Sequence, residues 1–327
     1  VFTTCKKNDD CPPWQISAEK IKHDKSKKTI YYDNAWLKIY DVPVLYFPRF
    51  FHPDPTVKKQ SGFLMPSIDS SNSIGTSFTL PYYHVISKNN DFTIKPRYFS
   101  KNKLLFQSEY RNVTENSENT FDFSLLGENN KSSKSHFFSN SRKRLYLKNF
   151  SESELNLQVQ STSNDTYLKT YRLKSPIINE SNLLRSFVEV SGYNDDTSFD
   201  LGFSSFEDLN KLNTDRFEFI YPSYSFSKTL DTDDRYNGNF TFNTTGFIKN
   251  YDTNIFEKVA INDLIFSSNP KINNFGIKND YKALIKNVNT DSINSIKYKN
   301  KRNHDLLSIF EYNSSIPLKK ETENYKN

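Results

Sequence analysis

Short amphipathic runs with a period of two residues recur through most of the chain, and they constrain its fold more than any other feature. In the run ELNLQVQS, residues 154–161, apolar Leu and Val alternate with Asn and Gln. Successive side chains of a strand point to opposite faces of a sheet, so this alternation predicts strands with one apolar and one polar face. Further runs of this kind are Leu104–Arg111, Thr120–Leu126, Thr166–Leu173, Ser186–Gly192, Ser198–Phe203, Arg216–Tyr221, Asn239–Thr244 and Ala283–Val288.

The segments between these runs are polar and rich in turn-forming residues, as in TENSEN, GENNKSSKSH and DTDDRYNGN. Phe206–Arg216 interrupts the rhythm and is interpreted as a loop. No exact internal repeat accompanies the strands, which argues against a solenoid or a propeller. The pattern therefore predicts an all-β fold made of many antiparallel strands.

Composition allows two kinds of all-β protein. Only 35% of the residues are hydrophobic, yet 15% are aromatic, with 28 Phe and 20 Tyr. A transmembrane barrel has this balance, because one face of each strand meets lipid, the other meets water, and aromatic side chains mark the interfaces. A soluble β-sandwich with a biased composition would give similar values, so composition alone favours neither fold.

The stretch from Cys11 to Pro66 differs from the rest. It contains three strand-like runs, Trp14–Ile21, Thr29–Tyr32 and Ala35–Tyr40, with alternating apolar side chains. Four prolines then fall within VPVLYFPRFFHPDP, and proline belongs at strand edges and exits because it lacks the N–H that a ladder needs. We interpret the stretch as the end of one β domain and a crossing into another.

The sequence lacks the motifs of several functional classes. No apolar run reaches the roughly 18 residues of a membrane-spanning helix. The histidines at 23, 52, 84, 136 and 304 are scattered, and no GxSxG or nucleotide-binding glycine motif is present. The net charge of +6 comes from dispersed residues, which indicates a solvated surface and no nucleic-acid module, although an anionic partner is compatible with it.

The only cysteines are Cys5 and Cys11. Their spacing does not match a zinc motif, and no metal site or cofactor is predicted. In an oxidising compartment they could pair with each other or with cysteines elsewhere in a longer chain, and the sequence does not choose between these pairings. The chain opens without a Met or a signal peptide, so we expect a fragment of a longer secreted protein.

Three blocks carry a family resemblance: PPWQISAEKI, the long run from Lys28 to Pro66, and TLPYYHVISKNNDFTIKP. In this order they resemble the outer-membrane lipopolysaccharide-assembly family (LptD/OstA/Imp), over roughly residues 11–98. The resemblance implies the last strands of a periplasmic β-jellyroll at 1–53, a crossing segment at 54–65, and the first part of a large antiparallel transmembrane β-barrel at 66–327. It also implies disulfides between the periplasmic domain and the barrel.

The resemblance assigns two functional regions. The apolar jellyroll face would hold acyl chains, with Ile16, Ala18, Ile30, Leu37 and Ile39 as candidates because they alternate on the predicted strands. Pro66 and Pro81 match prolines of the family's first barrel strands, where weakened pairing lets the wall open sideways as a lateral gate. Pro96 has a similar setting and a weaker claim.

The expected function is therefore that of a non-enzymatic translocon component in the Gram-negative outer membrane, with its N-terminal domain in the periplasm. As the resemblance implies, it receives lipopolysaccharide (LPS) from a periplasmic bridge protein and contains a lipoprotein plug. Two alternatives remain: a general porin or uptake barrel, which leaves the jellyroll-like start unexplained, and a soluble β-rich glycan-binding module.

Overall fold

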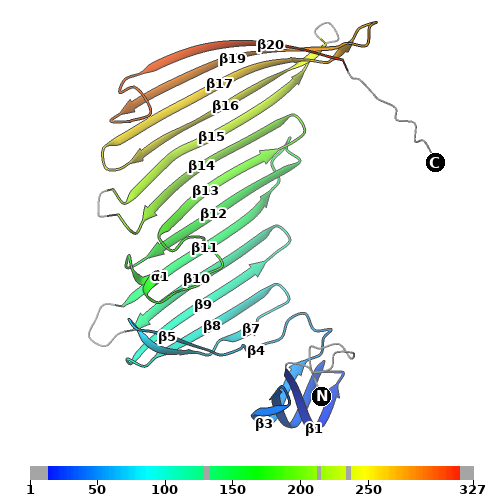
Figure 1. Cartoon of the computed structure of the whole chain (residues 1–327), viewed down its shortest axis with the longest axis vertical. Coiled ribbons are helices and arrows are strands. Elements are labelled where there is room, and N and C mark those ends of the chain that lie inside the picture. Colours follow the sequence, from blue (N-terminus) through cyan, green and yellow to red (C-terminus); the bar gives the residue numbers. More distant parts are fainter. Residues whose placement is uncertain (1–13, 128–132, 212–214, 233–236, 317–327) are drawn as a thin grey trace, which may run out of the picture. The chain divides into compact units, whose positions relative to one another are not determined.

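The computed structural model describes residues 14–127, 133–211, 215–232 and 237–316 (Figure 1). The chain divides into two compact units, and each is considered separately. Unit 1 comprises Val1–Leu64 and Tyr82–Lys88, and unit 2 comprises Met65–Pro81 and Asn89–Asn327. Cys5 and Cys11 lie outside the described residues. Across the described ranges, no helix is long and apolar enough to cross a membrane.

Unit 1 is built on a three-stranded antiparallel sheet in the order β1 (Trp14–Asp24), β2 (Thr29–Ile39) and β3 (Val42–Pro53). The runs Thr29–Tyr32 and Ala35–Tyr40, predicted as two strands, form the single strand β2, and no turn separates them. Asn34 has a left-handed backbone with φ of 50°, a conformation that Asn tolerates better than most residues. This residue resets the alternation, so Tyr32 and Ala35 are both buried although they are three positions apart.

The proline-rich stretch proved to be a strand rather than only a crossing. β3 pairs with β2 from Val42↔Ile39 to Pro53↔Thr29, and it lies at the edge of the sheet. An edge strand needs ladder donors on one side only, so it accommodates proline. A short pair, β4 (Gly62–Phe63) with β7 (Tyr82–Val85), completes unit 1.

Unit 2 is an antiparallel sheet in which consecutive strands pair as neighbours, and Figure 1 shows them side by side from β8 to β20. β5 begins one end of this sheet and β20 lies at the other. The strands are β5 (Ser67–Ser71), β6 (Gly75–Thr79), β8 (Asn90–Phe99), β9 (Lys103–Val113), β10 (Ser117–Gly127), β11 (Lys134–Leu145), β12 (Glu152–Thr162), β13 (Leu183–Tyr193), β14 (Thr197–Asp208), β15 (Phe217–Asp231), β16 (Gly238–Tyr251), β17 (Ile255–Ser268), β18 (Lys271–Ile272), β19 (Lys278–Ile293) and β20 (Asn303–Ser315).

The all-β, antiparallel prediction is confirmed, and most predicted runs lie inside observed strands. The strands are longer than the runs: Asn239–Thr244 belongs to the 14-residue β16, and Ala283–Val288 to the 16-residue β19. Phe206–Arg216 is a loop only in part, because β14 continues to Asp208. Alternation marks the centre of a strand, whereas backbone pairing extends into polar ends that carry no such signal.

One predicted strand, Thr166–Leu173, is wrong. Tyr167–Thr170 form the short helix α1, in which Thr170 and Tyr171 donate backbone hydrogen bonds four residues back. This helix belongs to the segment 163–182 between β12 and β13, which we call the strap. The strap packs on one face of the sheet, where buried Tyr167, Leu168, Tyr171 and Ile177 join a cluster with wall residues that include Leu105, Leu126 and Phe138.

Candidate lipid-contacting faces and gate

The predicted lipid-binding face of unit 1 exists as a cluster, with one exception. Ile16 is buried together with Tyr32 and Ala35, and Ala18, Ile30 and Leu37 pack against them. Ile39 does not join this cluster and is 43% exposed. The large side chains Phe47 and Phe50 of β3, which the sequence interpretation did not assign to the face, complete it. Four of the five candidates therefore lie together. Their role as a lipid groove stays a prediction.

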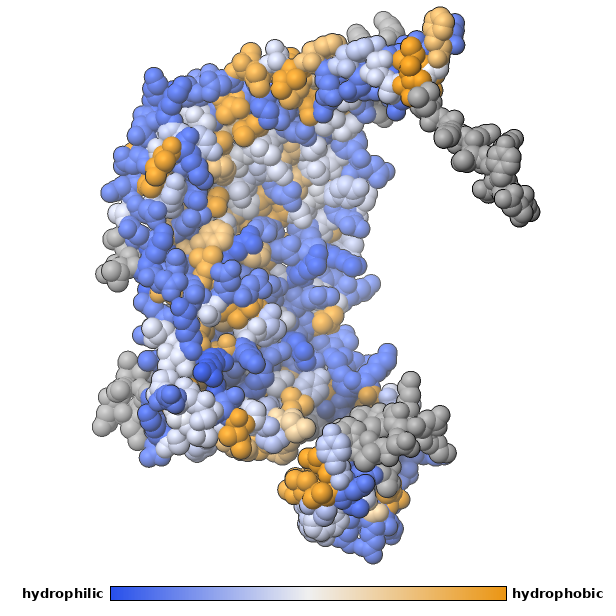
Figure 2. Space-filling view, viewed as in Figure 1, coloured by the Kyte–Doolittle hydropathy of each residue, from blue (hydrophilic) through white to orange (hydrophobic). Residues whose placement is uncertain are grey.

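Unit 1 also exposes much apolar surface. The exposed large side chains along and beside β3 are Trp36, Tyr40, Val42, Val44, Leu45, Tyr46 and Phe51. Exposed apolar surface of this kind, seen in part as orange atoms on unit 1 in Figure 2, is unusual for an isolated soluble domain and indicates contact with lipid or another chain.

The two gate prolines lie beside strands rather than within them. Pro66 immediately precedes β5, whose pairing with β6 ends at Ser67↔Thr79. Pro81 follows Leu80, whose N–H donates to the Pro96 carbonyl at 3.3 Å and ends the ladder with β8. Pro96 itself lies inside β8, opposite Phe106 of β9. Both gate candidates thus stand where hairpin pairing stops, and the sequence interpretation of a gate remains a prediction.

The strap defines two faces of the unit 2 sheet. On the face that it covers, here called the covered face, polar side chains alternate along β9 to β12 and several are buried, among them Gln107, Asp122, Ser124, His136 and Gln160. On the opposite face, the open face, apolar side chains are exposed: Phe106, Phe121, Phe123, Leu125, Phe137, Val159, Val188, Leu201, Phe203, Leu264 and Ile285. The polarity of this wall is the reverse of that of a soluble sheet packed on a core.

Three wall side chains hold the strap by its backbone. Arg97 Nη1 donates to the Tyr171 carbonyl at 2.7 Å, and Gln107 Nε2 donates to the Lys174 carbonyl at 2.9 Å. Gln160 Nε2 donates to the Ile177 carbonyl at 3.1 Å. The strap carbonyls are satisfied without a sheet ladder, as buried backbone groups must be. Sequence reasoning missed these anchors because each joins residues that local patterns cannot connect.

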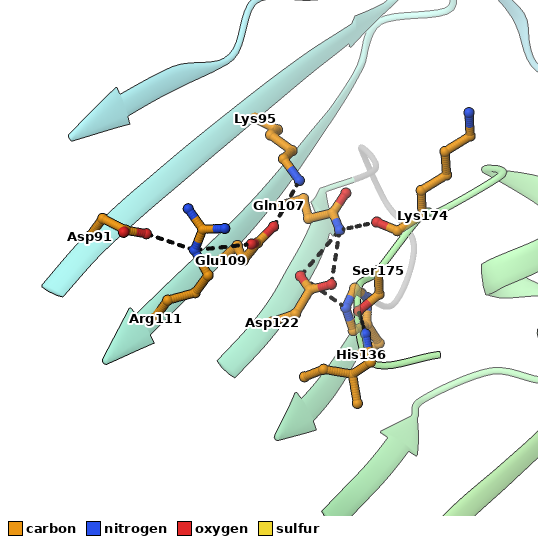
Figure 3. Close-up of polar contacts among 10 residues, drawn as sticks. Asp91, Lys95, Gln107, Glu109, Arg111, Asp122, His136, Lys174 and Ser175 are labelled. Atoms are coloured by element: carbon orange, nitrogen blue, oxygen red, sulfur yellow. Dashed lines mark hydrogen bonds and ion pairs between the residues drawn. The ribbon is translucent and has the colours of Figure 1, made fainter. Parts of the chain in front are cut away.

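Charged side chains form a network beside the strap (Figure 3). Arg111 Nε lies 2.7 Å from Asp91 Oδ1 and 3.6 Å from Glu109 Oε1, and Lys95 Nζ lies 3.2 Å from Glu109. The network crosses from β8 to β9 on the covered face, and in it the charges are paired. Because each charge has a partner of opposite sign, the wall contains ionised side chains without the free-energy cost of an isolated buried charge.

Next to this network, Ser124, His136 and Asp122 have the composition of a hydrolase triad. Ser124 Oγ lies 2.5 Å from His136 Nδ1, and His136 Nε2 lies 3.5 Å from Asp122 Oδ1. Figure 3 shows Gln107 donating to both oxygens of Asp122.

The cluster is nevertheless closed. Asp122 and Ser124 are 0% exposed, and Ser124 Oγ is also 2.8 Å from the Tyr167 hydroxyl of the strap. Burial raises the pKa of Tyr167 to about 12, so that hydroxyl keeps its proton. Because the serine oxygen is buried and bonded to a strap side chain, we interpret the cluster as an anchor of the strap. No group of side chains suited to a metal ion occurs in the described part of the chain.

Beyond the strap, the covered face continues into a polar groove of about 820 Å³. It lies toward the ends of the strands opposite to the strap loop, and its lining includes Glu118, Arg142, Arg144, Tyr146 and Glu154. Arg142 forms an ion pair with Glu154 there. The covered face is therefore mixed under the strap, where an apolar cluster lies among polar side chains, and hydrophilic toward the far ends of β10–β12.

An antiparallel wall with an exposed apolar face and a hydrogen-bonded polar face has the surface pattern of a transmembrane β-barrel wall. Turns 114–116 and 194–196 and the longer segment 269–277 lie at one end of the wall, whereas the strap, the turn 252–254 and the 294–302 loop lie at the other. At the far end of unit 2, β20 pairs with β19 from Asn303↔Thr290 to Ser315↔Lys278.

Comparison with known proteins finds segments similar to this chain in LPS-assembly proteins. The chain is 36% identical over 129 residues to the LPS-assembly protein LptD of Idiomarina loihiensis, which covers 38% of this chain and 16% of that protein. It is 34% identical over 127 residues to LptD of Pseudomonas fluorescens, covering 39% of the chain and 13% of that protein. It is 37% identical over 125 residues to LptD of Legionella pneumophila strain Paris, covering 38% and 14%.

Over about two fifths of its length the chain is therefore similar to part of the LPS-assembly proteins named LptD, which confirms the resemblance seen in the sequence. The matched part spans only about one seventh of the length of these relatives. No family model matches the chain.

Proposed function

We propose that the chain is part of a non-enzymatic component that assembles LPS at the Gram-negative outer membrane. The similarity to proteins known as LPS-assembly proteins supports the substrate, and the reversed polarity of the unit 2 wall supports a position in a membrane. The single observation that carries the proposal is the combination of the two: a segment similar to LPS-assembly proteins in a chain whose wall exposes apolar side chains.

In this proposal the two parts of LPS take different routes. Acyl chains contact the apolar face of unit 1 and leave through a lateral gate at Pro66 and Pro81, while the sugars follow the polar covered face. The physical reason is that burial of acyl chains contributes about 0.8 kcal/mol per CH₂ group, whereas unpaired burial of polar sugar hydroxyls is costly. A periplasmic bridge protein that delivers LPS and a lipoprotein plug inside the completed barrel are the proposed partners.

The substrate assignment can be tested by segment exchange. The matched segment of the Pseudomonas fluorescens relative is replaced by the corresponding segment of this chain, and surface LPS is measured after depletion of the native protein. We expect delivery to be restored relative to an empty vector. A chimera that is abundant and folded in the outer membrane but delivers no LPS would contradict the proposal.

The acyl-chain route is tested by photo-crosslinking in the full-length protein. A crosslinker at Leu37, which packs in the unit 1 cluster, should capture LPS, whereas one at the adjacent Lys38 should not, because neighbouring strand residues point to opposite faces. Equal capture at both positions would show that the cluster is only a core.

A further inference from the structure

The loop 294–302 between β19 and β20 combines positive charge with exposed apolar side chains. Its sequence, NSIKYKNKR, places Lys297, Lys299, Lys301 and Arg302 within six positions. All four are exposed, and Ile296 is 98% exposed. Among the described residues only Arg302 has an acidic partner within ion-pair distance, Asp291 at 3.2 Å. Three lysines of one short loop are therefore exposed, and no acidic side chain of the described residues lies within ion-pair distance of them.

Side-chain hydrogen bonds from β17 and β19 fix the conformation of the loop. Ser295 Oγ donates to Glu257 Oε1 at 2.6 Å, and Glu257 is only 2% exposed. The backbone N–H groups of Lys297 and Tyr298 donate back to Ser295 Oγ at 3.1 and 3.2 Å. Ser292 Oγ donates to the Lys299 carbonyl at 2.8 Å. A loop fixed in this way presents its lysines at a smaller entropic cost than a free tail would.

The strands below the loop show where a lipid surface would begin. On the open face, Phe242, Leu264 and Ile285 are directly paired across β16, β17 and β19, and Leu264 and Ile285 are well exposed. Closer to the loop, the same face becomes a chain of side-chain hydrogen bonds, which we call the polar ladder. It consists of Thr244, Asn262, Asn287, Asn289 and His304.

Along the strands, the open face thus passes from an apolar band that contains Phe242, Leu264 and Ile285 to the polar ladder, and then to the basic loop. In a bilayer this sequence of surfaces matches acyl chains, headgroup sugars and phosphates, because basic residues next to an apolar surface bind anionic headgroups. The exposed Ile293 and Ile296 beside the lysines add apolar contact at the same level.

We propose that loop 294–302 binds the phosphorylated sugar headgroups of the lipid surface that surrounds the wall. This proposal rests on the proposed function, since it requires the open face to lie in a membrane. The phosphates pair with Lys297, Lys299 and Lys301, and the polar ladder contacts the headgroup sugars below them. The loop would then anchor the β19–β20 end of the wall to the surface into which the protein delivers its substrate.

The test uses the full-length protein in detergent micelles and measures its binding of lipid A that carries both phosphates. The variant Lys297→Gln/Lys299→Gln/Lys301→Gln is compared with Lys271→Gln/Lys278→Gln/Lys282→Gln, which removes three charges at the opposite end of β19, from that strand and the adjoining β18. We expect the first variant to bind on the order of 100-fold more weakly at low ionic strength, and the second to bind as the wild type does.

Two further arms identify the ligand. Dephosphorylated lipid A should bind the wild type as weakly as lipid A binds the first variant, and inorganic pyrophosphate should compete only at high concentration if the lipid surface is the partner. Unchanged lipid A binding by the first variant would overturn the proposal, as would equally tight binding of free pyrophosphate. Membrane insertion is measured in parallel. Failure of the wild type to insert would refute the proposed function instead.

Discussion

The two units use apolar side chains in opposite ways. In unit 1 they gather on one face of a small sheet around buried Ile16, Tyr32 and Ala35. In unit 2 the wall between β9 and β12 buries polar side chains under the strap and exposes phenylalanines and leucines on its open face. The proposed function accounts for this difference, because the open face of unit 2 would then contact an apolar medium in which exposed phenylalanine and leucine side chains are stable.

The largest effect is expected from placing a charge on the open face. Leu157→Arg should destabilise the folded protein in lipid vesicles by about 2–4 kcal/mol, the cost of an arginine near the middle of a bilayer. Asn156→Arg is the matched control, because the adjacent residue lies on the covered face, where it is paired with Glu189 of β13. Unfolding by urea in vesicles gives both values.

These two variants test whether the two units differ in their surroundings. In a soluble wall, an arginine at partly exposed Leu157 would stay in water and cost little. Equal stabilities of the two variants would therefore mean that the open face does not contact lipid, and that unit 2 reverses its polarity for another reason.

A second variant tests the burial of polar groups under the strap. Gln107→Ala removes the donor to both oxygens of Asp122 and to the Lys174 carbonyl. Leaving such buried acceptors unsatisfied costs about 1–3 kcal/mol, so the strap should open more often. Hydrogen exchange of the backbone amides in residues 167–177 should accelerate. Gln158→Ala, which lies on the same face but does not bond the strap, should leave that exchange unchanged.

These anchors show what the sequence could not predict. Alternation located β9, β10 and β12 because it reflects the two faces of each strand. The same alternation in Thr166–Leu173 predicted a strand, although α1 and the strap form there. The local sequence does not distinguish a strand from the strap, because the strap is held by Arg97, Gln107 and Gln160. Arg97 and Gln107 are distant in sequence, and all three side chains bond backbone carbonyls, which every residue carries.

Unit 1 shows a different limit. The groove candidates other than Ile39 were found because they alternate, but β3 was not recognised as a strand because prolines usually end one. At the edge of the sheet a proline does not cost a ladder hydrogen bond, but the position of β3 at the edge is a property of tertiary structure. The Asn34 backbone likewise joins two predicted strands into one, and Asn is only one of several residues that adopt this conformation.

The gate prediction concerns a smaller energy. Pro66→Ala/Pro81→Ala in the full-length protein would restore two backbone N–H donors where the β5–β6 hairpin stops pairing. Each new hydrogen bond would contribute about 0.5–1.5 kcal/mol to the closed wall, and LPS delivery should slow while barrel abundance stays constant. Surface LPS and barrel abundance are measured together. Pro270→Ala, a proline beside β18, is the control. Unaltered delivery with a folded barrel would reduce the two prolines to simple strand ends.

The smallest effect concerns the turn that follows β3. Thr56 donates to Asp54 through its hydroxyl at 2.7 Å and its backbone N–H at 2.9 Å, and His23 Nε2 lies 2.7 Å from the other carboxylate oxygen. These contacts, the Thr56 hydroxyl first, hold the pKa of Asp54 below its ordinary value. The stabilisation is therefore present above the pKa of the unfolded chain, about 3.9, and it is lost as pH falls through the lower folded value.

A thermal melt of unit 1 in the intact protein should show this dependence. At pH 6 Asp54→Asn should lower the melting temperature slightly, and the gap between variant and wild type should close as the pH approaches 2, because protonation removes the same charge. Thr56→Val should give a smaller gap with the same pH dependence, since the backbone N–H of residue 56 remains. A gap that persists at low pH would assign the loss to packing and not to the carboxylate. Unit 2 should show no matching change between wild type and variant, because Asp54 belongs to unit 1 alone.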